Sequence, residues 1–273
     1  MPRTPSHLIA LFAPTLALST HGFAGLSDMY ITDSTGEIYF VDGNTLEATS
    51  LAQLENAGTI NDILYLGNGK ILANLTYAIV SYDLNTGIQE TLINTNGNLG
   101  QPGSFVYSSG LTRRTDGEIY LGITELLNPV GLDVYGISYN TLSQELSEVG
   151  AIPFPASYDF YELSNGNMIG FGTTGVSTLF NPNTGVIEAI FDLDIQATSF
   201  VQSLDELYVV AADGSLHTFD ITDGSTEFYA QISGVDAPVF GASIAISNAA
   251  LIPAPASMIV LTGGLGFGFR RRR

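Results

Sequence analysis

A turn-like segment recurs five times along this chain, and its spacing limits the possible folds more than any other property of the sequence. Each segment places Glu a few residues after an Asn-Thr or Thr-Asp pair: GNTLEATS at Gly43, LNTGIQET at Leu84, YNTLSQEL at Tyr139, PNTGVIEA at Pro182 and ITDGSTEF at Ile221. The intervals between these glutamates are 43, 55, 43 and 39 residues. A period of about 40 to 50 residues filled with short strands is typical of propeller blades.

A complete unit contains four short stretches with alternating or continuous apolar residues, which we predict to be strands. In the second unit they are residues 61–66, 70–75, 78–82 and 88–93. Asn-Thr-Gly and Thr-Asp-Gly suit the hairpin loops between strands, because Gly takes positive φ and Asn or Asp can hydrogen-bond its own backbone. The third unit has an insertion at residues 126–134, which explains the 55-residue interval and predicts a long loop on one face.

The first unit is one strand short, whereas an orphan strand at residues 239–246 follows the fifth unit. We therefore predict an all-β fold, a β-propeller of five four-stranded blades closed by this C-terminal strand pairing into the first blade. Closure leaves no open sheet edge at the join. A β-sandwich, or a six-bladed ring in which the 55-residue unit holds extra strands, are the alternatives. The body resembles a WD40 or quinoprotein-like β-propeller.

The N-terminus has the pattern of a secretory signal. It carries Arg3 without any acid, then an apolar run at residues 8–18, then Gly22 and Ala24 at the positions of a signal-peptidase site. We expect cleavage after Ala24. The predicted organisation is a signal peptide at residues 1–24, a propeller domain at 25–248 and a C-terminal sorting segment at 249–273.

The C-terminal segment consists of Pro253-Ala254-Pro255, an apolar Gly-rich stretch at residues 256–269 and a terminal cluster of Arg270, Arg271, Arg272 and Arg273. The stretch is short for a transmembrane helix, so transient membrane contact is expected, with the arginines on the cytoplasmic side. The arrangement resembles the PEP-CTERM sorting signals of bacterial envelope proteins, with Pro-Ala-Pro where that family usually has Pro-Glu-Pro. The resemblance implies recognition by an exosortase-type enzyme, removal of the tail and a place at the cell surface, often alongside exopolysaccharide. An ordinary C-terminal anchor is the alternative.

The charges separate the body from the ends. All 27 Asp and Glu lie between Asp28 and Asp236, where the only cations are Lys70, Arg113 and Arg114. Such an acidic body repels phosphate backbones, so nucleic acid is not an expected partner. The chain has no cysteine, which excludes disulfides, thiolate metal sites and a cysteine nucleophile.

The starts of the five predicted inner strands suggest a polar ring at the mouth of the central channel. In register, their second positions are Asp62, Ser104, Asp159, Ser199 and Val239. Convergent polar groups in a concave place are a candidate site. The simpler interpretation is that Asp and Ser hydrogen-bond backbone amides of the loop that enters each blade.

The sequence favours a secreted, non-catalytic binding or structural module of the bacterial envelope or its polysaccharide matrix, with polysaccharide or other envelope proteins as partners. The alternative is an extracellular glycosidase or lyase that uses Asp62 and Asp159 as its two carboxylates. No catalytic residue, metal site or cofactor is assigned, although the same carboxylates could hold Ca²⁺. His217 is the only histidine expected in the mature body, which excludes multi-histidine metal centres.

Overall fold

The computed structural model describes residues 26–55, 58–95, 99, 105–127, 131–141, 143, 145–153, 159–172, 175–203 and 206–245. The predicted signal peptide and C-terminal sorting segment lie outside these residues. No helix within the described ranges is long and apolar enough to cross a membrane.

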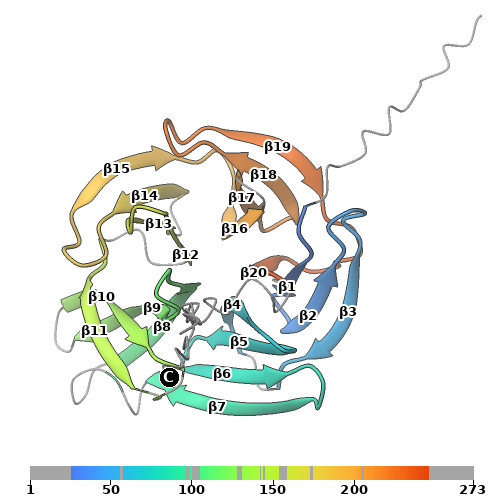
Figure 1. Cartoon of the computed structure of the whole chain (residues 1–273), viewed down its shortest axis with the longest axis horizontal. Helices are drawn as coiled ribbons and strands as arrows, with labels where there is room; N and C mark the ends of the chain where they lie inside the picture. The colour runs from blue at the N-terminus through green and yellow to red at the C-terminus, as the bar shows by residue number, and fades with distance from the viewer. Residues whose placement is uncertain are drawn as a thin grey trace, which may run out of the picture.

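The strands form five four-stranded antiparallel sheets arranged in a ring, which confirms the predicted five-bladed propeller (Figure 1). The inner strands, one per blade in chain order from blade 1, are β20 (Val239–Ile244), β4 (Ile60–Gly67), β8 (Phe105–Arg113), β12 (Asp159–Glu162) and β16 (Ala197–Ser203). The next strands outward are β1 (Met29–Asp33), β5 (Lys70–Leu75), β9 (Ile119–Leu127), β13 (Met168–Phe171) and β17 (Glu206–Ala211). The third strands are β2 (Glu37–Val41), β6 (Ala78–Asp83), β10 (Gly131–Tyr139), β14 (Val176–Phe180) and β18 (Ser215–Phe219). The outermost strands are β3 (Ala48–Gln53), β7 (Ile88–Asn94), β11 (Leu146–Ala151), β15 (Ile187–Asp192) and β19 (Thr226–Gln231).

The last strand closes the ring as predicted. β20 pairs with β1 antiparallel, from Met29 opposite Ile244 to Thr32 opposite Gly241. In Figure 1 the red-orange β20 accordingly lies beside the blue β1, so the two ends of the repeat array meet within one sheet. A second contact joins the ends at the rim, where Glu47 forms an isolated bridge with Ser233 of blade 5.

Hydrophobic burial connects neighbouring blades. Within the described residues, each of five apolar clusters combines side chains from two adjacent blades. The cluster between blades 5 and 1, for example, joins Val210 and Leu216 to Met29, Ile31 and Val239. Because each blade is half of two such clusters, no blade can leave the ring without exposing apolar surface on both sides.

The recurring turn segments connect the third and fourth strands, and local hydrogen bonds explain the repeat. The residue that opens each turn accepts backbone N–H groups two or three positions later through its side chain: Asp42, Asp83, Asn140, Asn181 and Asp220. Gly87, Gly185 and Gly224 then take positive φ, and Leu46 does so in the first turn. The repeated residues are therefore those that form the turn between the third and fourth strands of each blade.

These hydrogen bonds also correct two details of the sequence alignment. Asn140 occupies the opening position of its turn and matches Asp42, although the repeat pattern aligns the Asn-Thr pair that begins at Asn140 with Asn44-Thr45. The described parts of the predicted insertion, residues 126–127 and 131–134, are strand, since β9 and β10 pair from Gly131 opposite Leu127 down to Tyr139 opposite Ile119.

Candidate functional site

The predicted polar ring comes together only in part. Asp62, Asp159 and Ser199 are all buried, with at most 2% of each residue exposed. They lie near the central axis on the inner strands of blades 2, 4 and 5. Ser104 lies outside the described residues, and Val239 packs in the core between blades 5 and 1.

Each of these three side chains hydrogen-bonds a backbone N–H group on the inner strand of another blade. The carboxyl of Asp62 accepts hydrogen bonds from Ile63 N and from Leu111 N of blade 3, each at 2.7 Å. The carboxyl of Asp159 accepts Phe160 N at 2.6 Å, and from blade 5 it accepts Phe200 N at 2.7 Å and Ser199 Oγ at 2.8 Å.

Ser199 continues the same pattern, since its Oγ accepts Ala242 N of blade 1 at 3.1 Å. These polar side chains therefore hydrogen-bond inner strands of different blades. Along the chain, such strands are separated by at least the rest of one blade.

Glycine occupies this level in the two remaining blades. A Cβ added to Gly110 would lie 2.7 Å from Asp159 Cα, and one added to Gly241 would lie 2.7 Å from Ile63 N. Such contacts are closer than a side chain tolerates, so the close approach of the neighbouring inner strand requires glycine at these two positions. Register of the inner-strand starts predicts Ser104 and Val239 for these two blades, whereas the structure places Gly110 and Gly241 at this level.

Asp62 and Asp159 also form a carboxyl pair across the axis, because their side chains hydrogen-bond each other. Burial, together with the charge of Asp159, raises the pKa of Asp62 well above its usual range. Burial also raises the pKa of Asp159, although its hydrogen bonds from Asp62, Phe200, Ser199 and Phe160 oppose that shift. Because Asp159 accepts more donors, we expect the shared proton on Asp62 and the negative charge on Asp159.

This proton makes the unfolding free energy depend on pH. An unfolded Asp loses its proton at about pH 4, whereas folded Asp62 retains its proton at higher pH. The folded state therefore binds more protons than the unfolded state, and the free energy of unfolding falls as the pH rises above about 4. The loss is at most about 1.4 kcal/mol per pH unit. We expect Asp62→Asn, which cannot titrate, to lose less stability than the wild type between about pH 5 and about pH 7.5 in urea unfolding. Equal losses in both proteins would show that no proton is shared.

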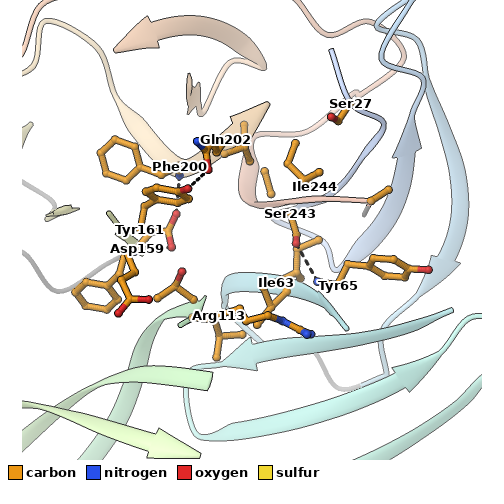
Figure 2. A pocket seen from close by; sticks show the side chains of 18 of the residues that line it. Ser27, Ile63, Tyr65, Arg113, Asp159, Tyr161, Phe200, Gln202, Ser243 and Ile244 are labelled. Atoms are coloured by element: carbon orange, nitrogen blue, oxygen red, sulfur yellow. Dashed lines mark hydrogen bonds between the residues drawn. The ribbon is translucent and has the colours of Figure 1, made fainter. Parts of the chain in front are cut away.

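A cavity of about 650 Å³ lies directly beyond this ring, where the five inner strands end (Figure 2). All five blades contribute to its wall. Ile63, Phe160 and Phe200 provide apolar surface, whereas Arg113, Tyr161 and Gln202 provide polar groups. The Tyr161 hydroxyl donates to the side-chain carbonyl of Gln202, and Tyr65 N donates to Ser243 Oγ at 2.9 Å. Asp159 lies at the inner end of this cavity, although only 2% of it is exposed.

Two of the body's three cations lie at this cavity, at the end of β8. Arg114 faces Glu162, with Nε 3.6 Å from Oε1, and Asp116, with Nη1 3.7 Å from Oδ2. Glu162 also accepts Thr115 N. In the sequence, Arg113 and Arg114 stand out only as rare cations and are assigned to no site. Their position at the end of a predicted inner strand was the signal that could have assigned them to one.

His217 does not complete a serine hydrolase triad. Ser215 Oγ donates to Asp213 Oδ1 at 2.6 Å and lies 2.9 Å from His217 Nε2, so serine stands between the acid and the histidine. In a triad the histidine stands between serine and acid. His217 also contacts the Phe228 ring edge-on, with ring centroids 5.7 Å apart. Across the described ranges, no group of three or more His, Asp and Glu side chains is placed to hold a metal ion.

Comparisons with known proteins support the fold but do not indicate a function. No protein-family model matches the chain, and no curated protein sequence matches it. The chain is similar to the solved structure of a protein of unknown function from Bacteroides caccae, with a TM-score of 0.50 and 15% sequence identity. The similarity covers 78% of this chain and 75% of that chain. At such low identity the likeness concerns the fold, so function has to be argued from the site.

Proposed function

We propose that this chain is a secreted or cell-surface β-propeller that acts as a non-catalytic binding module of the bacterial envelope or its polysaccharide matrix. The cavity at the end of the inner strands is the observation that carries the proposal. Its wall is largely apolar, with a guanidinium, a tyrosine and an amide among the polar groups. Small-molecule sites have this composition and typically about 300–1,000 Å³ of volume.

The carboxyl pair favours binding without hydrolysis. Glycosidases hold their two carboxyls about 5 to 10 Å apart so that the scissile bond and a water fit between them. Asp62 and Asp159 instead hydrogen-bond each other and accept backbone amides on both sides. The raised pKa of Asp62 is the one feature that an acid catalyst would share.

The proposed location outside the cytoplasm is based on the two ends of the chain. The signal-like residues 1–24 support export, and the resemblance of residues 249–273 to PEP-CTERM tails supports sorting by an exosortase-type enzyme. Both segments flank the closed ring, which begins with β1 and ends with β20, so their removal would not interrupt a blade.

The test is cosedimentation of the purified full chain with insoluble bacterial polysaccharides, with released reducing ends measured in the same tubes. We expect at least one polysaccharide to retain the protein without any release of reducing ends. Release that is lost in Asp62→Asn would instead support the enzyme alternative, because this variant keeps the side-chain shape but cannot donate an acid proton. Absence of retention on every polysaccharide would overturn the proposal.

A further inference from the structure

The carboxylates that line the cavity already have hydrogen-bond or ion-pair partners, whereas one of its two arginines has no carboxylate partner among the described residues. Among the described residues, three carboxylates line it, those of Asp28, Asp159 and Glu162. Asp28 accepts Gly43 N at 2.9 Å, and Asp159 accepts two backbone amides and a hydroxyl. Glu162 accepts Thr115 N and faces Arg114. Every carboxylate of the wall therefore already has donors from the protein.

Arg113 is in the opposite situation. No carboxylate in the described part of the chain lies within salt-bridge distance of its guanidinium, and one Nη2 contact with Leu66 O, at 3.4 Å, is long. The side chain is half-buried, and burial lowers its pKa, although an arginine remains charged at neutral pH. A guanidinium has five N–H donors, so most of those of Arg113 are available to a ligand in the cavity.

The rest of the wall restricts what kind of anion fits. Figure 2 shows Arg113 on one side of the cavity and Tyr161 with Gln202 on another. The Tyr161 ring is half-buried and offers an apolar face, and Gln202 and Ser243 supply polar groups that suit hydroxyls. A ligand that satisfies all of them has one anionic group on a ring that carries hydroxyls.

The net charge of the body limits how many anionic groups the ligand carries. The body holds 27 acids against three cations, so a long polyanion is repelled along most of the surface. A single acidic group that reaches Arg113 avoids most of that repulsion, because a carboxylate within hydrogen-bond distance interacts far more strongly than charges farther away in salt.

We infer that this cavity binds an acidic sugar, a single or terminal uronate whose carboxylate is held by Arg113. The inference rests on the proposed binding function and specifies its ligand class. A planar guanidinium holds a carboxylate through two parallel hydrogen bonds, and such charge-assisted pairs are stronger and more directional than neutral ones. Asp159, whose negative charge is stabilised by donors from the protein, also lines the cavity and disfavours a second carboxylate beside it.

The test compares two ligands that differ only in the acid group, methyl β-D-glucuronide and methyl β-D-glucoside, by isothermal titration of the full chain. We expect the glucuronide to bind at least about tenfold more tightly. Arg113→Gln should abolish this preference, whereas Arg113→Lys should retain part of it because the charge remains. Lys70→Gln is the matched control, since it removes one positive charge on the β4–β5 hairpin and should leave the preference unchanged. Thermal unfolding of each variant checks that it is folded.

The outcomes separate the ligand class from the function. Equal binding of both glycosides by the wild type and Arg113→Gln would overturn the uronate inference and leave a binding module in place. A glucuronide preference that survives in Arg113→Gln would overturn the role of Arg113. Failure to bind either glycoside, in a protein that cosediments with polysaccharide, would overturn the inference alone. Failure in both assays would overturn the proposed function as well.

Discussion

A chain that ends at Asp236 should not fold, whereas a chain that ends at Leu251 should fold as the full chain does. The shorter chain lacks β20, the inner strand of blade 1, which pairs with β1 along its whole length. It also loses Val239 and Ala242 from the cluster between blades 5 and 1, and the Ala242 N–H that Ser199 accepts. Burial of one aliphatic side chain contributes about 1.5–3 kcal/mol, and a domain has only about 5–15 kcal/mol in total.

The measurement is circular dichroism with thermal unfolding of both truncated chains. The chain that ends at Asp236 should show no cooperative transition, because β1 is left as an open edge and blades 1 and 5 lose part of their common core. A cooperative transition at the wild-type midpoint would contradict closure through β20. The chain that ends at Leu251 is the control and also tests the tail: it should fold but fail to be sorted in the producing cell. Loss of folding in this control would overturn the sorting assignment.

Asp159→Asn should lower the free energy of unfolding by about 3 kcal/mol, whereas Asp62→Asn should lower it by less, about 1 to 2 kcal/mol. Asp159 uses both oxygens as acceptors, for Phe160 N on one side and for Phe200 N with Ser199 Oγ on the other. An Asn amide would turn its NH₂ toward N–H donors whichever way it is oriented, and buried donors would lose their acceptor. At Asp62 the same change also removes one acceptor, because Oδ1 accepts Ile63 N and Oδ2 accepts Leu111 N, but it replaces a protonated carboxyl rather than a charged one, and the NH₂ can take over the donation to Asp159.

Urea unfolding of the two variants at neutral pH measures this asymmetry. The two substitutions make the same chemical change in two equally buried carboxyls, so each is the control for the other. Equal losses would contradict the assignment of the proton to Asp62, and a larger loss in Asp62→Asn would reverse it. Ser199→Ala should add little to Asp159→Asn, because both remove the same link between blades 4 and 5.

The blade architecture could be predicted because its signals are local. Asp83 caps its own turn and Gly87 takes positive φ within the same few residues, so the turn is encoded without reference to the rest of the fold. Alternating apolar residues mark the strands for the same reason. Closure followed from counting, because one strand was missing at the start and one was left over at the end.

The pairing of the site residues could not be predicted in the same way. Asp62 and Asp159 could be identified because they occupy the same position in two repeats. Their partners Leu111 and Phe200 lie on other blades, and no local sequence pattern predicts these contacts. In blade 3 the irregular pairing between Ser108 and Leu111 places Gly110 at the ring, which sequence register alone did not show.

The sequence by itself determined the number of blades, the turns between their strands and the strand that closes the ring, because propensity, capping and apolar periodicity act within a few residues. Only the tertiary structure decided that the two buried carboxyls of blades 2 and 4 pair with each other and that Arg113 lines a cavity without a carboxylate partner in the described chain. Both features depend on distances between inner strands, and these are set by how the blades pack against one another.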